Sequence, residues 1–497
     1  MLVTALKGWW YEKSGAFVPK AAQKLSWFNL DWFLRGSLRT LPWRILRTSE
    51  NKIRSLAASL VARTLKAATD MSTRALDKAV LNGPEKSRRR LEKGKGRTLW
   101  GVTPILTLPL KARADRLLGF RSHSLVFVTY YITRNFDFNL RVLVNGVARY
   151  APGLSPSLDK LILAWAISRY DVFHYFYDRG LMAPATRFGI NPMELDLLRA
   201  AGKRVYGYAY GADVRRRKAT LALGKWNFCS DCPEPSKFCI CDDESGSQIM
   251  QGMCEKLTAA NALGDMLTYV PDARNMHYWP IDLEKIPFAP VAREDGPLKI
   301  AHAPNHGHFK GTHYLEEAID RLKQAGHEIE YIKVQGVPNT EVIRLFSEAD
   351  VVADQFIGGA YGYTALEAMA CGKPVLTYVR SSDLVEAVGE CPLINVTPDT
   401  LEATLRWCLE NRGKLATIGA QGRAYVERWH SVDAVAGRLG KMYRDTADFP
   451  PVTARRVKES RARIEVARET IAQAQEWHHP YLVQNGDPSP PVAGLAP

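Results

Sequence analysis

The sequence predicts an α/β protein with two Rossmann-like domains that face a cleft, preceded by a basic helical extension. Short β-rich runs alternate with helical stretches from about residue 122, and a second series of this kind begins at residue 298. Between the two series, Tyr278-Trp-Pro-Ile-Asp282 and the following prolines are typical of an interdomain connection. A chain of 497 residues is also too long for one compact core.

The extension, residues 1–97, is expected to be helical. It holds 21 Lys and Arg against 7 Asp and Glu, so it carries nearly all of the net charge of +15. Trp and Phe lie beside Arg over residues 27–47, and the charge run 86–97 is typical of a solvated linker. This composition suits the surface of an anionic membrane. Packing of the aromatic face on the protein itself is an alternative, and no recognisable module supports nucleic-acid binding.

The expected location is the cytoplasm, with the extension holding the protein on the inner face of the cell membrane. No run of about eighteen apolar residues predicts a transmembrane helix. The N-terminus has no uninterrupted apolar stretch with a small-residue cleavage site, so it does not read as a signal peptide.

The N-terminal Rossmann-like domain is expected over residues 120–282. Its predicted strands are Ser124–Thr129, Tyr170–His174 and Arg204–Tyr208. The loop after the third strand brings Tyr210 and Asp213 to the carboxyl edge of the sheet, where ligands bind in such folds. His174 either approaches the same cleft or is a satisfied histidine at a strand end.

The C-terminal domain is expected over residues 290–446, followed by a helix at 447–479 and a disordered Pro- and Gly-rich tail at 480–497. Its strands are predicted at 298–302, 329–334, 350–354 and 374–378. Its helices are predicted at 312–324, 339–347 (with Asn339 as a cap) and 362–372.

Two loops of this domain favour a phosphate-containing ligand. Each leaves a strand and enters a helix, whose free backbone N–H groups attract anions. The first loop carries Lys310, and the second is rich in glycine and precedes Glu367, a carboxylate in an otherwise apolar helix. Their combination favours a binding role over a surface lysine and a structural carboxylate.

These segments resemble the family 4 retaining glycosyltransferases, which have the GT-B fold. The resemblance rests on Lys310-Gly311-Thr312, on Glu348 to Gln355, and on Tyr361-Gly362 through Ala365-Leu-Glu367-Ala-Met-Ala to Gly372-Lys-Pro374. It implies that Lys310 binds the donor diphosphate and that Glu367 binds ribose or sugar hydroxyls. It also implies that the glycine-rich loop, at Tyr361, Gly362 and Thr364, contacts the donor phosphates. Further expected substrate contacts are Gly311, Thr312 and Asn305, in the loop of Lys310, and His302 and Gly336, at strand ends.

Two positions depart from the family pattern. Gly359 stands where the family has the first Glu of its Glu-x7-Glu motif, a departure that resembles a distinct bacterial subgroup. Tyr210 stands where the family has a histidine beside the reacting sugar carbon, with Asp213 in the same loop. Tyrosine is a poor general base near neutral pH, so the donor's own phosphate is expected to take the acceptor proton.

The predicted activity is sugar transfer, with retention, from a nucleotide-sugar donor to a cell-envelope glycan or lipid-linked acceptor. No metal is required for the transfer. Two alternatives are a non-catalytic scaffold that kept the fold, favoured by Gly359 and Tyr210, and a sugar-nucleotide epimerase, which would need carboxylates near the donor sugar.

Four cysteines, Cys229, Cys232, Cys239 and Cys241, form a compact cluster. Their spacing suits tetrahedral binding of a structural zinc ion. An iron–sulfur centre, two disulfides and no metal are the alternatives, of which the first lacks any other sign of redox chemistry.

Overall fold

The computed structural model describes residues 43–186, 188–291 and 295–446, with residues 43–54 described by their backbone alone. The chain divides into two compact units, Met1–Met71 and Ser72–Pro497. In the first unit, helix α3 (Trp43–Glu92) begins, and its side chains at Leu56 and Leu60 are 70% and 66% exposed. None of the helices in the described ranges combines the length and the hydropathy that a membrane span requires. The aromatic residues before 43, the predicted helix 447–479 and the tail lie outside the described residues.

The predicted linker at 86–97 is wrong, because the end of α3 is part of the N-terminal domain. Leu76 and Ala79 lie in the core of that domain. The guanidinium of Arg90 lies 2.5 Å from the buried carboxylate of Asp171, and Ser87 donates to the same carboxylate at 2.8 Å. These charges are therefore paired within the fold.

The predicted start of the first domain at residue 120 is also wrong. The first strand, β1 (Arg97–Val102), and the helix α4 (Leu108–Leu117) precede that boundary. β1 lies in the middle of the seven-stranded sheet between β2 and β4, and every described pairing in this sheet is parallel. The sheet order is β3-β2-β1-β4-β5-β6-β7, with strands β2 (Arg121–Val126), β3 (Phe138–Asn139), β4 (Val172–Phe176), β5 (Arg204–Tyr208), β6 (Ala259–Ala262) and β7 (Arg274–Asn275).

The C-terminal domain holds a second parallel sheet, in the order β12-β11-β10-β8-β9. The predicted strands and helices are confirmed to within one or two residues. The strands are β8 (Leu298–His302), β9 (Ile329–Lys333), β10 (Val351–Ala353), β11 (Val375–Thr377) and β12 (Ile394–Asn395). The helices are α10 (Gly307–Lys310), α11 (Thr312–Gln324), α12 (Asn339–Glu348), α13 (Tyr363–Ala370), α14 (Leu401–Glu410) and α15 (Arg412–Trp429).

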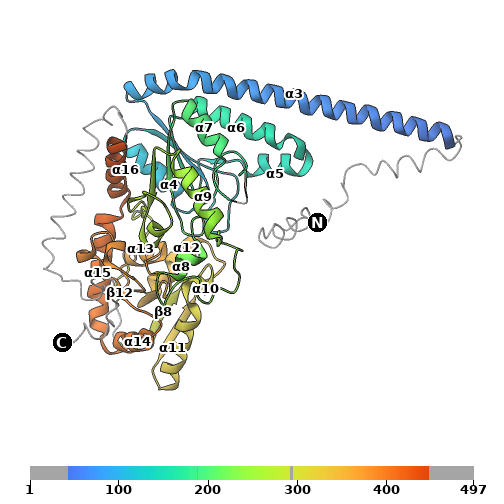
Figure 1. The fold of residues 1–497 in the computed structure, drawn as a ribbon. Helices are drawn as coiled ribbons and strands as arrows, with labels where there is room; N and C mark the ends of the chain where they lie inside the picture. The colour runs from blue at the N-terminus through green and yellow to red at the C-terminus, as the bar shows by residue number, and fades with distance from the viewer. Residues whose placement is uncertain (1–42, 187, 292–294, 447–497) are drawn as a thin grey trace. The chain divides into compact units, whose positions relative to one another are not determined.

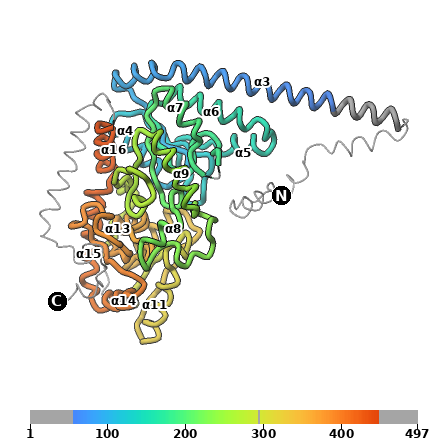
Figure 2. Tube along the Cα trace, in the orientation of Figure 1, coloured from blue at the N-terminus to red at the C-terminus, as the bar shows by residue number. Residues whose placement is uncertain are grey.

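The last described helix, α16 (Val432–Thr446), corrects the predicted boundary at 446. It packs beside α4 of the N-terminal domain, as Figures 1 and 2 show. Val435 and Leu439 are fully buried in that domain's core. The chain thus crosses between the domains twice, and the crossing segments lie side by side, since the backbone N–H of Ile281 donates to the carbonyl of His430 at 2.7 Å.

The remaining helices of the N-terminal domain are α5 (Arg141–Tyr150), α6 (Ser155–Arg169), α7 (Pro192–Ala200), α8 (Arg217–Leu221) and α9 (Asp243–Cys254). His174 is buried in this domain's core and does not approach a binding edge. Its ring stacks on Trp100 at 3.8 Å, and its nitrogens hydrogen-bond to the hydroxyls of Tyr208 and Tyr443. Burial lowers the pKa of His174 well below its usual value. It is the satisfied core histidine of the two predicted alternatives.

Candidate functional site

The carboxyl ends of β8, β9, β10 and β11 form one edge of the C-terminal sheet. In parallel α/β sheets, ligands bind at this edge, because the strand-to-helix loops present backbone N–H groups there. Lys310 and Gly362 lie in the loops that follow β8 and β10, which are neighbouring strands of the sheet. The fold therefore brings together the two segments that the sequence analysis singled out.

Lys310, Asp354 and Gly362 form a compact charged group at this edge. The Nζ of Lys310 lies 2.5 Å from one carboxylate oxygen of the fully buried Asp354. The second carboxylate oxygen accepts from the backbone N–H of Gly362, at the start of α13, at 2.6 Å. A Cβ atom at residue 362 would lie 3.0 Å from Asp354 and 3.1 Å from Lys310, so only glycine fits comfortably. The group combines a cation with a helix N-terminus, which is an arrangement that attracts phosphate.

Glu367 lies one turn into α13 and is buried. The side-chain amide of Asn339 donates to its carboxylate at 2.6 Å, so Asn339 is not the helix cap that the sequence predicts. Burial raises the pKa of Glu367 to about 7, and the hydrogen bond from Asn339 and the charge of Lys310 oppose that rise. The carboxyl group is thus placed to exchange a proton, or to accept hydrogen bonds, near neutral pH.

His302 and Thr312 hold the first loop in place from beneath. Nδ1 of His302 bonds the carbonyl of Ala353 at 2.9 Å, and Nε2 bonds the hydroxyl of Thr312 at 2.8 Å. Both ring nitrogens are therefore used by the protein, and burial lowers the pKa of His302 to about 4. The left-handed backbone of Gly311, with φ of 68°, lets the chain leave α10 and enter α11.

The other predicted donor contacts divide between exposed and buried positions. Asn305 and Gly336 are exposed, and Asn305 accepts from the hydroxyl of Tyr131, in the N-terminal domain, at 3.5 Å. Thr364 is partly exposed in the first turn of α13. Tyr361 is buried, and its hydroxyl contacts rings of both crossing segments, at His277 and His430. Its side chain supports the domain junction.

At the carboxyl edge of the N-terminal sheet, Asp213 shapes the loop that carries Tyr210. One oxygen of Asp213 accepts from the backbone N–H groups of Tyr210 and Gly211, both at 2.9 Å. Asp213 is 4% exposed, and burial raises its pKa to about 8. These hydrogen bonds let Asp213 shape the loop, and its contact with substrate stays a prediction, whereas Tyr210 is 37% exposed at this edge.

Asp178 is a residue that the sequence analysis missed. It lies two residues after the end of β4 and accepts from the hydroxyl of Thr103 at 2.6 Å and from the hydroxyl of Tyr210 at 3.4 Å. Burial raises its pKa to about 6. The strand-end position that selected His302 and Gly336 in the second sheet would have found Asp178 as well.

The four clustered cysteines lie in the loop between α8 and α9 and are all free thiols. The guanidinium of Arg215 donates to the sulfur of Cys239 at 3.4 Å, and the backbone N–H of Ser236 donates to the sulfur of Cys241 at 3.1 Å. Within the described part of the chain, no group of three or more His, Cys, Asp or Glu side chains is arranged to hold a metal ion. The zinc site stays a prediction.

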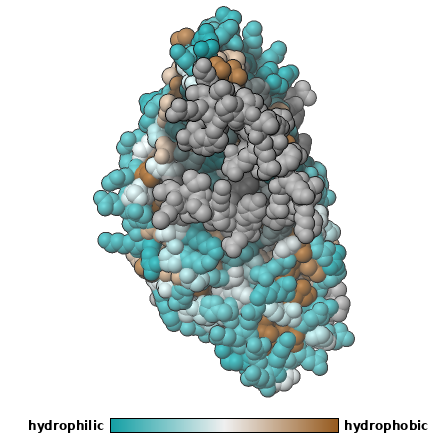
Figure 3. All heavy atoms as spheres, turned by 90° about the vertical axis from the view of Figure 1, so that its right-hand side faces the viewer, coloured by the Kyte–Doolittle hydropathy of each residue, from teal (hydrophilic) through white to brown (hydrophobic). Residues whose placement is uncertain are grey.

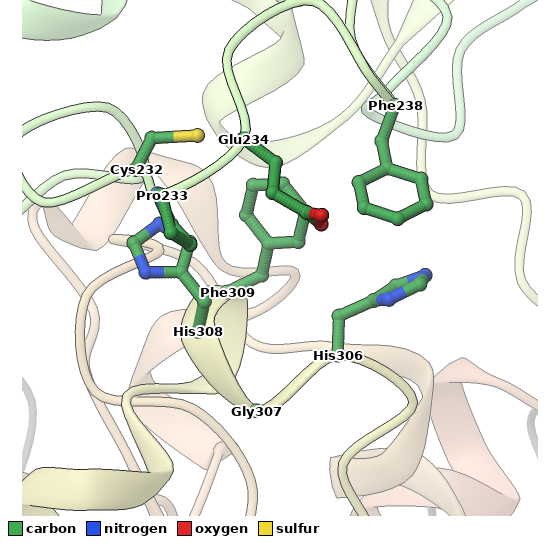
Figure 4. Close-up of a pocket in the computed structure, with 8 residues that line it drawn as sticks. All are labelled: Cys232, Pro233, Glu234, Phe238, His306, Gly307, His308 and Phe309. Atoms are coloured by element: carbon green, nitrogen blue, oxygen red, sulfur yellow. The ribbon is translucent and has the colours of Figure 1, made fainter.

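This cysteine loop contacts the loop that carries Lys310. Figure 4 shows residues of both loops around one pocket, with the rings of Phe238 and His306 next to each other in its lining. Their ring centroids are 4.4 Å apart, and Nε2 of His308 donates to the carbonyl of Phe228 at 3.2 Å. The loops at the carboxyl edges of the two sheets therefore meet.

A family model described as "Glycosyl transferases group 1" matches residues 294–425. This range contains Lys310, Gly362 and Glu367. A search of curated proteins finds no match. The match confirms the prediction of a glycosyltransferase enzyme, while family 4 and retention stay predictions.

Three solved structures are similar to the chain at low identity. The HepE protein of Anabaena in complex with UDP and glucose is 12% identical, covers 70% of this chain and 99% of its own, and has a TM-score of 0.44. Sucrose-phosphate synthase of Thermosynechococcus elongatus is 13% identical, with 71% and 98% covered and a TM-score of 0.46. The catalytic domain of starch synthase IV of Arabidopsis thaliana, bound to ADP and acarbose, is 9% identical, with 71% and 99% covered and a TM-score of 0.46.

At this level of similarity, the fold assignment depends on the chain's own topology. Two parallel sheets are joined by paired crossing segments, and the last described helix returns to the first domain. This is the predicted GT-B arrangement, and it places the matched glycosyltransferase domain, residues 294–425, opposite a second sheet edge that carries Tyr210 and Asp178.

Proposed function

We propose that the chain transfers a sugar, with retention, from a nucleotide-sugar donor held by the C-terminal domain to a cell-envelope glycan or lipid-linked acceptor. The observation that carries this proposal is the group formed by Lys310, Asp354 and the N-terminus of α13. The Asp354 carboxylate accepts from the ammonium group of Lys310 and from the backbone N–H of Gly362. A donor diphosphate offers the same partners an anion of higher charge.

In the proposed mechanism, Lys310 and the α13 N-terminus stabilise negative charge on the leaving diphosphate. Electrostatic stabilisation of this kind, from groups already in position, is commonly the largest contribution to catalysis. Glu367 accepts hydrogen bonds from donor hydroxyls. Tyr210 and Asp178 bind acceptor hydroxyls at the facing sheet edge, and the donor phosphate takes the acceptor proton. The residues supply all of these roles without a metal ion.

Two alternatives make different predictions. A sugar-nucleotide epimerase would change the donor without an acceptor, and a scaffold would bind no donor. Gly359 stands in place of the family carboxylate, and an epimerase would need carboxylates near the donor sugar, so this position disfavours the epimerase. The presence of Lys310, Gly362 and Glu367 at one sheet edge favours a donor-binding enzyme over the scaffold.

The test is calorimetric binding of UDP-, GDP-, ADP- and CMP-sugars to the full chain and to Lys310→Ala. We expect one nucleotide to bind, and the substitution to weaken it by about 10- to 100-fold, because a charge-assisted contact is worth about 1.5–3 kcal/mol. Lys323→Ala, in the last turn of α11, is the matched control. Absence of binding by every donor would favour the scaffold.

We further propose that the N-terminal extension holds the enzyme on the inner face of the cell membrane. The exposed Leu56, Leu60 and Val61 of α3, among basic residues, support this. On the face that Figure 3 presents, hydrophobic residues form small groups within a mostly hydrophilic surface. Sedimentation with vesicles of anionic lipid, compared with neutral vesicles, tests the proposal, and equal sedimentation with both would refute the charge argument.

We also propose that the four clustered cysteines bind a structural zinc ion. The support for this proposal is the spacing of the four cysteines, which suits tetrahedral binding of zinc by thiolates. Elemental analysis of the purified chain should find one zinc per molecule and less in Cys239→Ser. A metal-free, fully folded chain would refute the zinc site.

A further inference from the structure

Arg380 occupies the space beside Gly359, in the same loop that leads to Gly362. A Cβ atom at residue 359 would lie 2.4–2.6 Å from Cζ and the two terminal nitrogens of the Arg380 guanidinium. The backbone of Gly359 has φ of 78°, and its carbonyl accepts from the backbone N–H of Arg380 at 2.8 Å. The two residues thus form one unit, in which the absence of a side chain at 359 makes room for a cation.

This cation lies at the ligand edge of the sheet. Arg380 follows β11 (Val375–Thr377), and Gly359 follows β10, which pairs with β11 in parallel. Both residues therefore lie beyond the carboxyl ends of neighbouring strands, on the same edge as Lys310. Two residues separate Gly359 from Gly362, whose N–H already binds a carboxylate.

The Arg380 guanidinium is incompletely paired. One terminal nitrogen donates to the carbonyl of Trp226 at 3.3 Å, while Nε is buried and has no hydrogen-bond partner. Across the described ranges, no carboxylate lies within 4 Å of Arg380. Two other partly buried arginines each have one, at 2.5 Å for Arg428 and 3.1 Å for Arg438.

A second arginine lies near the same acidic side chain as Arg380. The carboxylate of Asp265 acts on both Arg380 and Arg215, and it lies 3.9 Å from the guanidinium of Arg215. Two guanidinium groups thus share one carboxylate. Since a guanidinium binds carboxylates and phosphates through two parallel N–H bonds, this site favours an oxyanion ligand.

We propose that Arg380 binds an anionic group of the nucleotide-sugar donor, either the second phosphate or a carboxylate on the transferred sugar. The inference rests on the proposed function, because it assumes that the donor lies at the Lys310 edge. A purely structural role for Arg380, through Trp226 of the N-terminal domain, would change the binding of every ligand to a similar extent.

The experiment measures binding by calorimetry to the full chain, to Arg380→Met and Arg380→Lys, and to the surface control Arg321→Met. The ligands are the mono- and diphosphate of the nucleoside that the wild type prefers, and its diphospho-glucose and diphospho-glucuronate. Circular dichroism at matched concentration checks that each variant is folded.

Two results support the proposal and separate its two forms. A sugar carboxylate is indicated when wild type prefers the glucuronate by about 10-fold or more, and Arg380→Met abolishes the preference. The second phosphate is indicated when Arg380→Met weakens the diphosphate and both sugars by about 10- to 100-fold but leaves the monophosphate unchanged. In either case Arg380→Lys, which keeps the charge without the fork, restores part of the affinity.

Two results overturn it. If Arg380→Met binds all four ligands with wild-type affinity, or if its affinity for all four falls by the same factor, Arg380 does not contact the anionic group. If the wild-type chain binds none of them, the proposed function fails together with this inference, whereas binding that depends on Lys310 alone leaves the proposed function intact.

Discussion

Replacing Glu367 by Gln should stabilise the protein and weaken the donor site at the same time. Raising the pKa of Glu367 from 4.5 to about 7 makes its ionisation in the folded chain cost about 3 kcal/mol. Since the folded chain holds the proton more tightly than the unfolded chain, this carboxyl favours folding at low pH. Its contribution falls as the pH rises from about 4.5 to about 7, and stays constant above that.

Glu367→Gln keeps the shape of the side chain and the acceptor for Asn339, but it cannot ionise. The variant should therefore melt at a higher temperature than wild type at pH 8, and the difference should shrink towards pH 5. With about 3 kcal/mol at stake and about 2–4 °C per kcal/mol for a domain of this size, a change of several degrees is expected. Calorimetric melting at four pH values between 5 and 8 measures it.

The same variant should bind the donor about 10-fold or more weakly, because an ionised acceptor of hydrogen bonds is lost. The control is Glu341→Gln, on the exposed face of α12. Hydrogen bonds from Arg344 lower the pKa of Glu341, so the contribution of this carboxylate to stability rises with pH, opposite to that of Glu367. A melting difference that does not change with pH would refute the argument from burial. Unchanged donor affinity would refute the assignment of Glu367 to the site.

Other predictions concern buried charges and the facing sheet edge. Lys111 is fully buried among three aromatic rings, and burial lowers its pKa from 10.5 to about 7. Lys111→Met should therefore stabilise the chain at pH 7 by several kcal/mol, and by less at pH 10. The difference is expected because the wild type itself gains stability as the pH rises from about 7 to 10.5. Equal stabilisation by the substitution at both pH values would contradict this. Asp178→Asn should raise the acceptor KM about 10-fold without changing donor affinity, and a loss of donor affinity would move Asp178 out of the acceptor role.

Much of the fold was predictable because its signals are local. β5, β8 and α11 lie where the alternation of strand and helix patterns predicts them. β1 was missed because it follows a charge run that suggests a solvated linker, although tertiary pairing with Asp171 neutralises part of that run. The place of α16 was unpredictable from its own pattern, since its partner α4 lies more than 300 residues earlier in the chain.

The candidate site was predictable in position but not in detail. Strand ends located Lys310 and Glu367, yet they also selected His302, whose nitrogens are used by Ala353 and Thr312. Such partners come from distant segments, so the pattern around a residue does not show whether its side chain faces a ligand or supports a loop. Arg380 illustrates the converse, because its closeness to Gly359 and its unpaired buried Nε, which no sequence pattern shows, make it a candidate.

A crystal structure of the chain with the nucleoside diphosphate that it binds would test the central claim most directly. The account predicts that the phosphates lie at Lys310 and the N–H of Gly362, in place of the Asp354 carboxylate, with the ribose hydroxyls at Glu367. A diphosphate bound elsewhere, with the contacts of Asp354 to Lys310 and Gly362 unchanged, would contradict it.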